Sequence, residues 1–155
     1  MATEIRRDFP DDLHLVAVLT GAFVFLADLM RDLDGPVSID FIGVSSYGTA
    51  TASSGRVSLV KDLDVDPAGR NVVLVEDIVD TGVTLAYLQQ HLRSRAPRAL
   101  ATASLLSKPA RRRTDVTIDY VGFTIDDAFV VGYGLDYAGQ YRNLPYIAIA
   151  AEEIV

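Results

Sequence analysis

VVLVEDIVDTGVTL, residues 72–85, is the stretch that decides the fold of this chain. Its first four residues are all apolar, as in a strand that is buried on both faces of a parallel sheet. Glu76 and Asp77 end this run, and a small, hydroxyl-rich turn follows from Asp80 to Thr84. We therefore predict a buried strand, a tight turn and a helix, in that order.

The turn at residues 80–84 has the composition of an anion-binding loop. Backbone N–H groups at the start of a helix have no partner within the helix and can bind a phosphate. An ordinary strand-to-helix connection could look similar, because Asp and Thr cap helices and Gly suits turns. Such a connection does not need the three carboxylates of Glu76, Asp77 and Asp80. Beside a phosphate, these would bind sugar hydroxyls, Mg²⁺ or a proton in transit.

Elsewhere the apolar residues follow either a strand or a helix pattern. Strands are predicted at 14–19, 37–47, 57–60, 99–106, 120–123, 129–133 and 146–151, and helices at 22–33 and 81–95. This order predicts an α/β fold with a mostly parallel twisted sheet, flanked by helices, and a site at the carboxyl ends of the strands.

Two segments do not fit this alternation. Residues 1–12 are mostly polar and are expected to form a frayed tail or the end of a short helix. Residues 48–55, GTATASSG, have no large apolar side chain and are expected to form a mobile loop that could serve as a lid. Residues 45–60 would then be a hairpin-like flap outside the main sheet.

The composition favours a single globular domain over residues 1–155. Hydrophobic residues make up 50% of the chain, which is enough for a substantial core. The net charge of −7 argues against a nucleic-acid-binding surface. The chain has no cysteine, and no segment has the pattern of a membrane span or a signal peptide. We expect a cytoplasmic protein with neither nucleic acid nor membrane as a partner.

Five motifs, in order, resemble those of type I phosphoribosyltransferases, and in particular of their hypoxanthine-guanine branch. They are LTG at 19–21, SSYG at 45–48, VEDIVDTGVT at 75–84, SKP at 107–109 and VVGYGLDYAGQYRNLPYI at 130–147. The resemblance covers residues 13–151. It implies the fold of that family, with a flap hairpin near 45–60 and a small C-terminal hood. It also implies Mg²⁺-dependent transfer of phosphoribosyl from phosphoribosyl pyrophosphate to a purine base in purine salvage, by a homodimer or homotetramer.

The resemblance assigns roles to the residues of the central stretch. Four residues of the turn would hold the 5′-phosphate: Thr81, Gly82, Val83 and Thr84. Glu76 and Asp77 would lie along the ribose hydroxyls, directly or through Mg²⁺. Asp80 would face N7 of the purine, where a general base can manage the proton that is lost during transfer.

The resemblance also implies a pyrophosphate site. Arg142 would contact pyrophosphate oxygens, and Asp136 would bind the Mg²⁺ that the pyrophosphate carries. Backbone N–H groups of Thr20 and Gly21 would complete this site. Many relatives have Lys or Arg where this chain has Thr20, so one cation is missing here. In the family the peptide bond before this position is often cis, which for this chain is the bond Leu19–Thr20.

The purine would be recognised by residues far along the chain. Lys108 would donate to the 6-oxo group, which favours 6-oxopurines such as hypoxanthine and guanine over adenine. Phe129 would stack on the base, Val130 would meet the base edge through its backbone, and Asp136 would border the same pocket. Ser46 and Tyr47 would belong to the flap that closes over the site.

Several residues have a structural alternative. Lys108 could be a solvated loop lysine, and residues 111–113, three arginines, are expected to form a solvated turn rather than to bind substrate. Asp136, Tyr137, Tyr141 and Arg142 could otherwise form a helix surface with a tyrosine pair. His14 and His91 are expected to be structural or solvent-facing. The activity itself has two alternatives: transfer to another base, such as xanthine or a purine analogue, or a non-catalytic regulator with the same fold.

Overall fold

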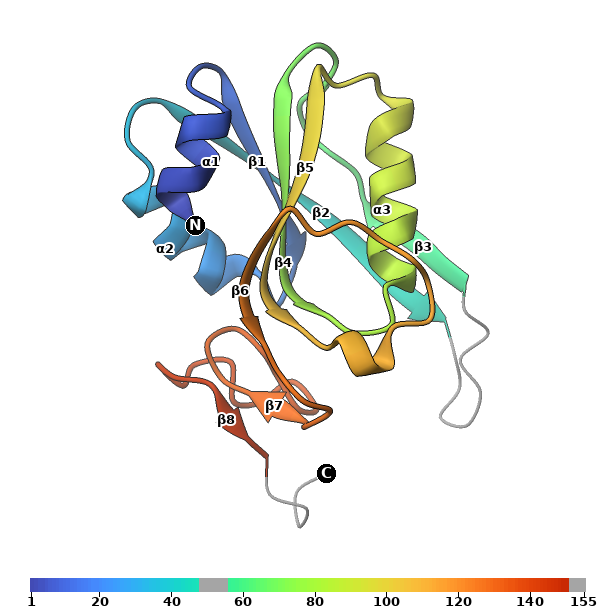
Figure 1. Ribbon diagram of the computed structural model, residues 1–155. Coiled ribbons are helices and arrows are strands. Elements are labelled where there is room, and N and C mark those ends of the chain that lie inside the picture. The colour runs from blue at the N-terminus through green and yellow to red at the C-terminus, as the bar shows by residue number, and fades with distance from the viewer. Residues whose placement is uncertain (48–55, 151–155) are drawn as a thin grey trace.

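The computed structural model describes residues 1–47 and 56–150 (Figure 1). The chain forms three α-helices, a 3₁₀ turn and eight strands over these residues. In chain order they are α1 (Ala2–Asp8), β1 (Leu13–Leu19), α2 (Phe23–Asp32), β2 (Val37–Tyr47), β3 (Arg56–Lys61), β4 (Asn71–Val79), α3 (Val83–Ser94), β5 (Ala99–Ser107), η1 (Pro109–Arg111), β6 (Tyr120–Thr124), β7 (Val130–Val131) and β8 (Ala148–Ile149).

Six strands form the central sheet in the order β3-β2-β1-β4-β5-β6. All neighbours pair in parallel except β2 and β3, which are antiparallel. Figure 1 shows α1 and α2 on one side of this sheet and α3 on the other. The predicted α/β architecture is therefore confirmed, and parallel strands are expected to be covered by helices on both faces.

The core explains why residues 72–75 are continuously apolar. Successive side chains of a strand point to opposite faces, so β4 contributes to two separate hydrophobic clusters. Val73 and Val75 pack in the cluster that contains α1 and α2, whereas Val72 and Leu74 pack in the cluster that contains α3. The face of α3 that was expected to be buried is buried: Leu85, Leu88 and Leu92.

The N-terminal segment contributes more to the fold than expected. It forms α1, and Ile5 is completely buried in the cluster that also holds α2. Tyr120 Oη on the edge strand β6 donates to Asp8 Oδ2 at the end of α1, at 2.8 Å. Of the two alternatives for residues 1–12, the short helix is the one observed and the frayed tail is wrong. A single apolar residue in a short helix gives little sequence signal but can still fill the core.

The flap hairpin also differs from the prediction. The hairpin exists, but β3 pairs with β2 as an edge strand of the central sheet, so it does not lie outside that sheet. Ser46 and Tyr47 lie at the end of β2, paired with Val57 and Arg56. The predicted lid loop, residues 48–55, lies outside the described residues.

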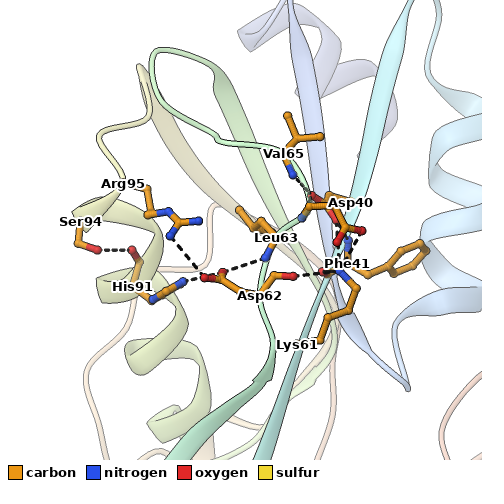
Figure 2. A network of polar contacts seen from close by, with 10 residues as sticks. Asp40, Phe41, Lys61, Asp62, Leu63, Val65, His91, Ser94 and Arg95 are labelled. Carbon is orange, nitrogen blue, oxygen red and sulfur yellow. Dashed lines mark hydrogen bonds and ion pairs between the residues drawn. The ribbon is translucent and has the colours of Figure 1, made fainter.

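A polar network ties the base of this hairpin to the sheet and to α3 (Figure 2). Asp40 on β2 is buried and accepts hydrogen bonds from the N–H groups of Asp64 and Val65, at 2.8 and 3.0 Å. Asp62 contacts two residues at the end of α3, His91 Nε2 at 3.0 Å and Arg95 Nη1 at 3.4 Å. The structural role expected for His91 is the one observed.

The C-terminal part, residues 126–150, is called the hood here. It lies beyond the carboxyl ends of β4 and β5 in Figure 1 and contains the short antiparallel pair β7-β8. Between these strands the chain forms turns, with positive φ angles at Tyr133, Ala138 and Tyr141. The helix considered for residues 136–142 is therefore absent.

Over residues 1–47 and 56–150, no helix has both the length and the apolar character needed to span a membrane.

Candidate active site

A cavity of about 330 Å³ opens at the carboxyl ends of β1 and β4. It brings together predicted residues from three separate parts of the chain, and its lining consists of Val18, Leu19, Thr20, Gly21, residues 76–82, Thr84, Leu85, Asp136 and Arg142. Among the residues predicted for phosphoribosyl binding, Val83 alone does not line the cavity. We call this space the phosphoribosyl cavity.

The turn after β1 forms one wall of this cavity. The peptide bond Leu19–Thr20 is cis, as expected from the resemblance. Gly21 follows it, and a Cβ atom at Gly21 would overlap the carboxylate of Asp77. The absence of a side chain at Gly21 therefore allows the acidic end of β4 to lie directly against this turn.

The turn 80–84 forms the opposite wall and leads into α3. Gly82 is the N-cap residue with φ +84°, a conformation that favours glycine. It has no side chain to cap the helix, and the N–H of Val83 makes only a long hydrogen bond to Thr81 Oγ1, at 3.5 Å, so N–H groups of the first turn remain available to an anion. The segment after η1 holds this turn in place, because Thr81 O accepts hydrogen bonds from the N–H groups of Arg113 and Thr114, at 2.9 and 3.1 Å.

Glu76 and Asp77 place two carboxyl groups in a poorly solvated part of the cavity. Burial raises the pKa of Glu76 well above its usual value, and the charge of Asp77 raises it further. Burial also raises the pKa of Asp77, although the N–H of Ile78 donates to Asp77 Oδ1 at 2.8 Å and opposes this effect. Such a pair is stabilised by a bound cation or by hydroxyl donors, both of which a ribose with a divalent metal would supply.

Asp136 and Arg142 form a preassembled pair on the hood side of the cavity. Arg142 Nη2 lies 2.7 Å from Asp136 Oδ1, and Arg142 Nη1 donates to Gly134 O at 2.6 Å. Within the described residues, no three His, Asp or Glu side chains converge closely enough to hold a metal by themselves. The acidic residues instead fit Mg²⁺, which keeps several waters and takes other ligands from substrate phosphates.

Lys108 lies beside the phosphoribosyl cavity but does not line it. The backbone N–H of Lys108 donates to Val79 O at 3.0 Å, which fixes the backbone of Lys108 next to the end of β4. Lys108 is only 7% exposed, and its Nζ lies 3.9 Å from Asp127 Oδ1. The alternative of a solvated loop lysine is therefore wrong.

Phe129 and Val130 lie in the hood, also outside the phosphoribosyl cavity. The ring of Phe129 is 42% exposed and packs edge to face against Tyr137, with 5.6 Å between ring centroids. Val130 begins β7 and lines a separate, mainly apolar cavity of about 470 Å³ between the hood and the ends of β5 and β6. Phe129 thus keeps exposed surface that a flat base could contact.

The structure corrects the interpretation of the three arginines. Arg111 Nε lies 2.9 Å from Asp80 Oδ1, and Arg111 Nη1 lies 3.2 Å from Asp127 Oδ2. Arg112 Nη2 donates to Ser107 Oγ at 2.9 Å and this residue is half-buried, whereas Arg111 and Arg113 are exposed, as expected for a solvated turn. Arg111 and Asp127 are the residues that sequence reasoning missed. The spacing of Lys108 and Arg111 could have indicated Arg111. Residues three apart lie on the same side of a 3₁₀ turn, so Arg111 lies on the same side as Lys108.

A mostly parallel sheet, an open helix N-terminus and an acidic pair at one strand end define a class of protein: a phosphoribosyltransferase of the type I fold. A family model, described as the phosphoribosyl transferase domain, matches residues 1–138.

Relatives of known sequence and structure specify the branch. The chain is 47% identical to the hypoxanthine-guanine phosphoribosyltransferase of Bacillus subtilis, covering 96% of this chain and 83% of that protein. It superimposes with a TM-score of 0.92 on a hypoxanthine-guanine phosphoribosyltransferase from Bacillus anthracis (51% identity, 97% of this chain and 89% of that chain). For a hypoxanthine phosphoribosyltransferase from Trypanosoma cruzi in complex with the product IMP, the TM-score is 0.90 (41% identity, 99% and 87% coverage).

This chain belongs to the hypoxanthine-guanine branch of the type I phosphoribosyltransferase family. The family, the fold class and the enzyme class predicted from the sequence are thereby confirmed.

Proposed function

We propose that this chain transfers the phosphoribosyl group from phosphoribosyl pyrophosphate to N9 of hypoxanthine or guanine and releases pyrophosphate. The products are IMP and GMP, and the reaction serves purine salvage. One observation carries the proposal: a single cavity combines an open helix N-terminus at Gly82, the acidic pair of buried Glu76 and half-buried Asp77, and the Asp136–Arg142 pair. These are, in order, the groups that a 5′-phosphate, a ribose and a pyrophosphate require.

The turn 80–84 binds the 5′-phosphate through the backbone N–H groups and hydroxyls of Thr81, Gly82, Val83 and Thr84. Glu76 and Asp77 accept hydrogen bonds from the ribose hydroxyls. When a bound cation and the ribose hydroxyls stabilise their ionised forms, their negative charge also favours the positive charge that develops at C1′ as the bond to pyrophosphate breaks. Burial strengthens this effect, because electrostatic interactions are weakly screened in a poorly solvated site.

Pyrophosphate leaves on the side of the cavity that contains Thr20, Gly21 and Arg142. Arg142 and the backbone N–H groups of the turn after β1 bind its oxygens. Glu76, Asp77 and Asp136 would hold Mg²⁺ jointly with the substrate. When bound, Mg²⁺ neutralises charge on the leaving group. Thr20 stands where many relatives have Lys or Arg. In this chain, Arg142 therefore supplies a larger share of the positive charge that binds the pyrophosphate oxygens.

Asp80 acts as the general base. It faces N7 of the purine and takes the proton that the base loses as the bond between N9 and C1′ forms. The buried Lys108 donates to the 6-oxo oxygen, and the amino group of adenine cannot accept that bond. Phe129 stacks on the base, Val130 meets its edge through the backbone, and Asp136 borders the same pocket. Ser46 and Tyr47 belong to a flap that excludes water.

Initial rates on a panel of bases test the proposal. Hypoxanthine, guanine, xanthine and adenine are each incubated with phosphoribosyl pyrophosphate and Mg²⁺, and nucleotide formation is followed by chromatography, with chelated metal as a control. We expect turnover of hypoxanthine and guanine, loss of turnover with chelator, and little reaction of adenine. Formation of no nucleotide from any 6-oxopurine would refute the proposal, and a preference for xanthine would support the alternative base.

A cytoplasmic location and a homodimer or homotetramer belong to the same proposal. The open edge of the sheet supports self-association, because Val121 and Phe123 on β6 are 42% and 64% exposed. Light scattering of the purified chain measures the assembly directly. A monomer across the micromolar range would contradict the predicted oligomer.

A further inference from the structure

Four charged side chains form a chain of ion pairs beside the phosphoribosyl cavity. Arg111 Nε lies 2.9 Å from Asp80 Oδ1, Arg111 Nη1 lies 3.2 Å from Asp127 Oδ2, and Lys108 Nζ lies 3.9 Å from Asp127 Oδ1. Positive and negative groups alternate along it. We call Asp80, Arg111, Asp127 and Lys108 the charge bridge.

The charge bridge joins three segments with different tasks. Asp80 follows β4 at the phosphoribosyl cavity, Lys108 precedes the 3₁₀ turn η1 after β5, and Arg111 is the last residue of that turn. Asp127 precedes the hood strand β7 and lies two residues before Phe129. The N–H of Arg111 donates to Lys108 O at 3.2 Å, so the turn fixes these two residues relative to each other. Arg111 therefore connects the donor side of the site to the purine side.

Asp80 Oδ1 keeps a free hydrogen-bonding capacity within this bridge. The atom is buried and, within residues 1–47 and 56–150, has no aligned hydrogen-bond donor. The Nε of Arg111 is close enough for an ion pair, but its N–H is not directed at this oxygen. A buried acceptor without a hydrogen bond is unfavourable, so Asp80 is prepared to accept one from a ligand. Arg111 balances its charge without using that acceptor.

Arginine suits this position better than lysine would. The planar guanidinium has five N–H donors in a fixed arrangement and contacts two carboxylates at once. The ion pairs themselves contribute little to folding stability, because the Arg111 side chain is 43% exposed and water screens the pairs. An arginine that connects two segments of a site, at little benefit to stability, is best explained by the geometry that it maintains.

We propose that Arg111 is a positioning residue that keeps the carboxylate of Asp80 in the place from which it reaches N7 of the purine, and that Asp127 holds Arg111 in place. This inference rests on the proposed function, because its effect is observed through Asp80. Arg111 itself does not line the phosphoribosyl cavity.

Steady-state kinetics of the full chain test this role. The variants are Arg111→Gln, Arg111→Lys, Asp127→Asn, the double variant of Arg111→Gln with Asp127→Asn, and Asp80→Asn. Arg95→Gln is the matched control, because Arg95 is a partly exposed arginine that pairs with Asp62 away from the site. For each, kcat with hypoxanthine, the KM for phosphoribosyl pyrophosphate and the melting temperature are measured.

Arg111→Gln is expected to lower kcat about tenfold and to leave the KM for phosphoribosyl pyrophosphate and the melting temperature near those of the parent. Arg111→Lys should restore part of the rate, because one ammonium group reaches only one carboxylate. The double variant should be little slower than Arg111→Gln alone, since Asp127 acts through Arg111. Arg95→Gln should match the parent.

The inference is overturned if Arg111→Gln keeps kcat within twofold of the parent, or if its loss of rate follows a fall in melting temperature that Arg111→Lys does not rescue. A normal rate for Arg111→Gln together with a slow Asp80→Asn variant would reject the positioning role of Arg111 and leave the general-base role of Asp80 intact. A normal rate for Asp80→Asn would reject the proposed general base and, with it, this role of Arg111.

Discussion

Gly82→Ala is the substitution that most directly tests the phosphate-binding turn. Gly82 has φ +84°, and a Cβ atom there would lie 2.7 Å from Thr114 O and 3.0 Å from Arg112 Cδ. The side chain of Arg112 can move, but the backbone that carries Thr114 O is anchored to the same turn, because the N–H groups of Arg113 and Thr114 donate to Thr81 O at 2.9 and 3.1 Å. The new methyl group must therefore push the turn toward the cavity.

The size of the effect follows from two contributions. Alanine in a left-handed conformation costs roughly 1–2 kcal/mol of folding stability wherever it occurs. Ordinary contact begins at 3.4 Å, so relief of the 2.7 Å contact requires a shift of 3.4 − 2.7 = 0.7 Å. A misplacement of about 1 Å in a binding site can reduce the rate about 10²-fold. We expect the KM for phosphoribosyl pyrophosphate to rise about 10- to 100-fold, which corresponds to about 1.4–2.8 kcal/mol.

Gly69→Ala provides the matched control. Gly69 has φ +71°, but nothing lies within 4 Å of the position of its Cβ, and it is in the loop before β4, at the opposite end of that strand from the cavity. Both variants should lose similar stability from backbone strain in urea titrations, whereas only Gly82→Ala should raise the KM. If the two variants have the same KM within a factor of two, the assignment of residues 80–84 as the phosphate site is refuted.

Three further substitutions test other parts of the site and fold. Asp80→Asn should lower kcat about 10²-fold with little change in the KM for phosphoribosyl pyrophosphate, as expected for removal of a general base; an unchanged rate in the same assay would exclude that role. Lys108→Met should lower kcat/KM for hypoxanthine about 10- to 100-fold through loss of the bond to the 6-oxo group, and a variant that still prefers hypoxanthine over adenine as strongly as the parent would contradict this. Burial, assisted by the charge of Arg70, lowers the pKa of His14 in the folded state. The unfolded chain therefore binds the proton more readily, and the free energy of unfolding should fall as the pH drops below about 6.5, more in the parent than in His14→Gln. Urea titrations at pH 7.5 and 5.5 measure this fall, and an equal fall in the parent and in His14→Gln would count against it.

Local patterns made much of this fold predictable. The apolar run at 72–75 identified β4, and the spacing of Leu85, Leu88 and Leu92 identified the buried face of α3. Gly82 and its neighbours marked the start of that helix. Each of these features depends on residues close together in the chain, and the physical constraint that produces it, burial or helix capping, is local too.

The sequence by itself determined the order of strands and helices after residue 12, the anion-binding turn and the acidic end of β4. Only the tertiary structure decided that β3 joins the central sheet, that Ile5 fills the core, and that Arg111 contacts Asp80. Asp80 and Arg111 are far apart in the chain and come together because β4 and β5 are parallel neighbours whose carboxyl ends lie at the same edge of the sheet. Contacts of this kind depend on which strands pair, and pairing is chosen by the packing of the whole molecule.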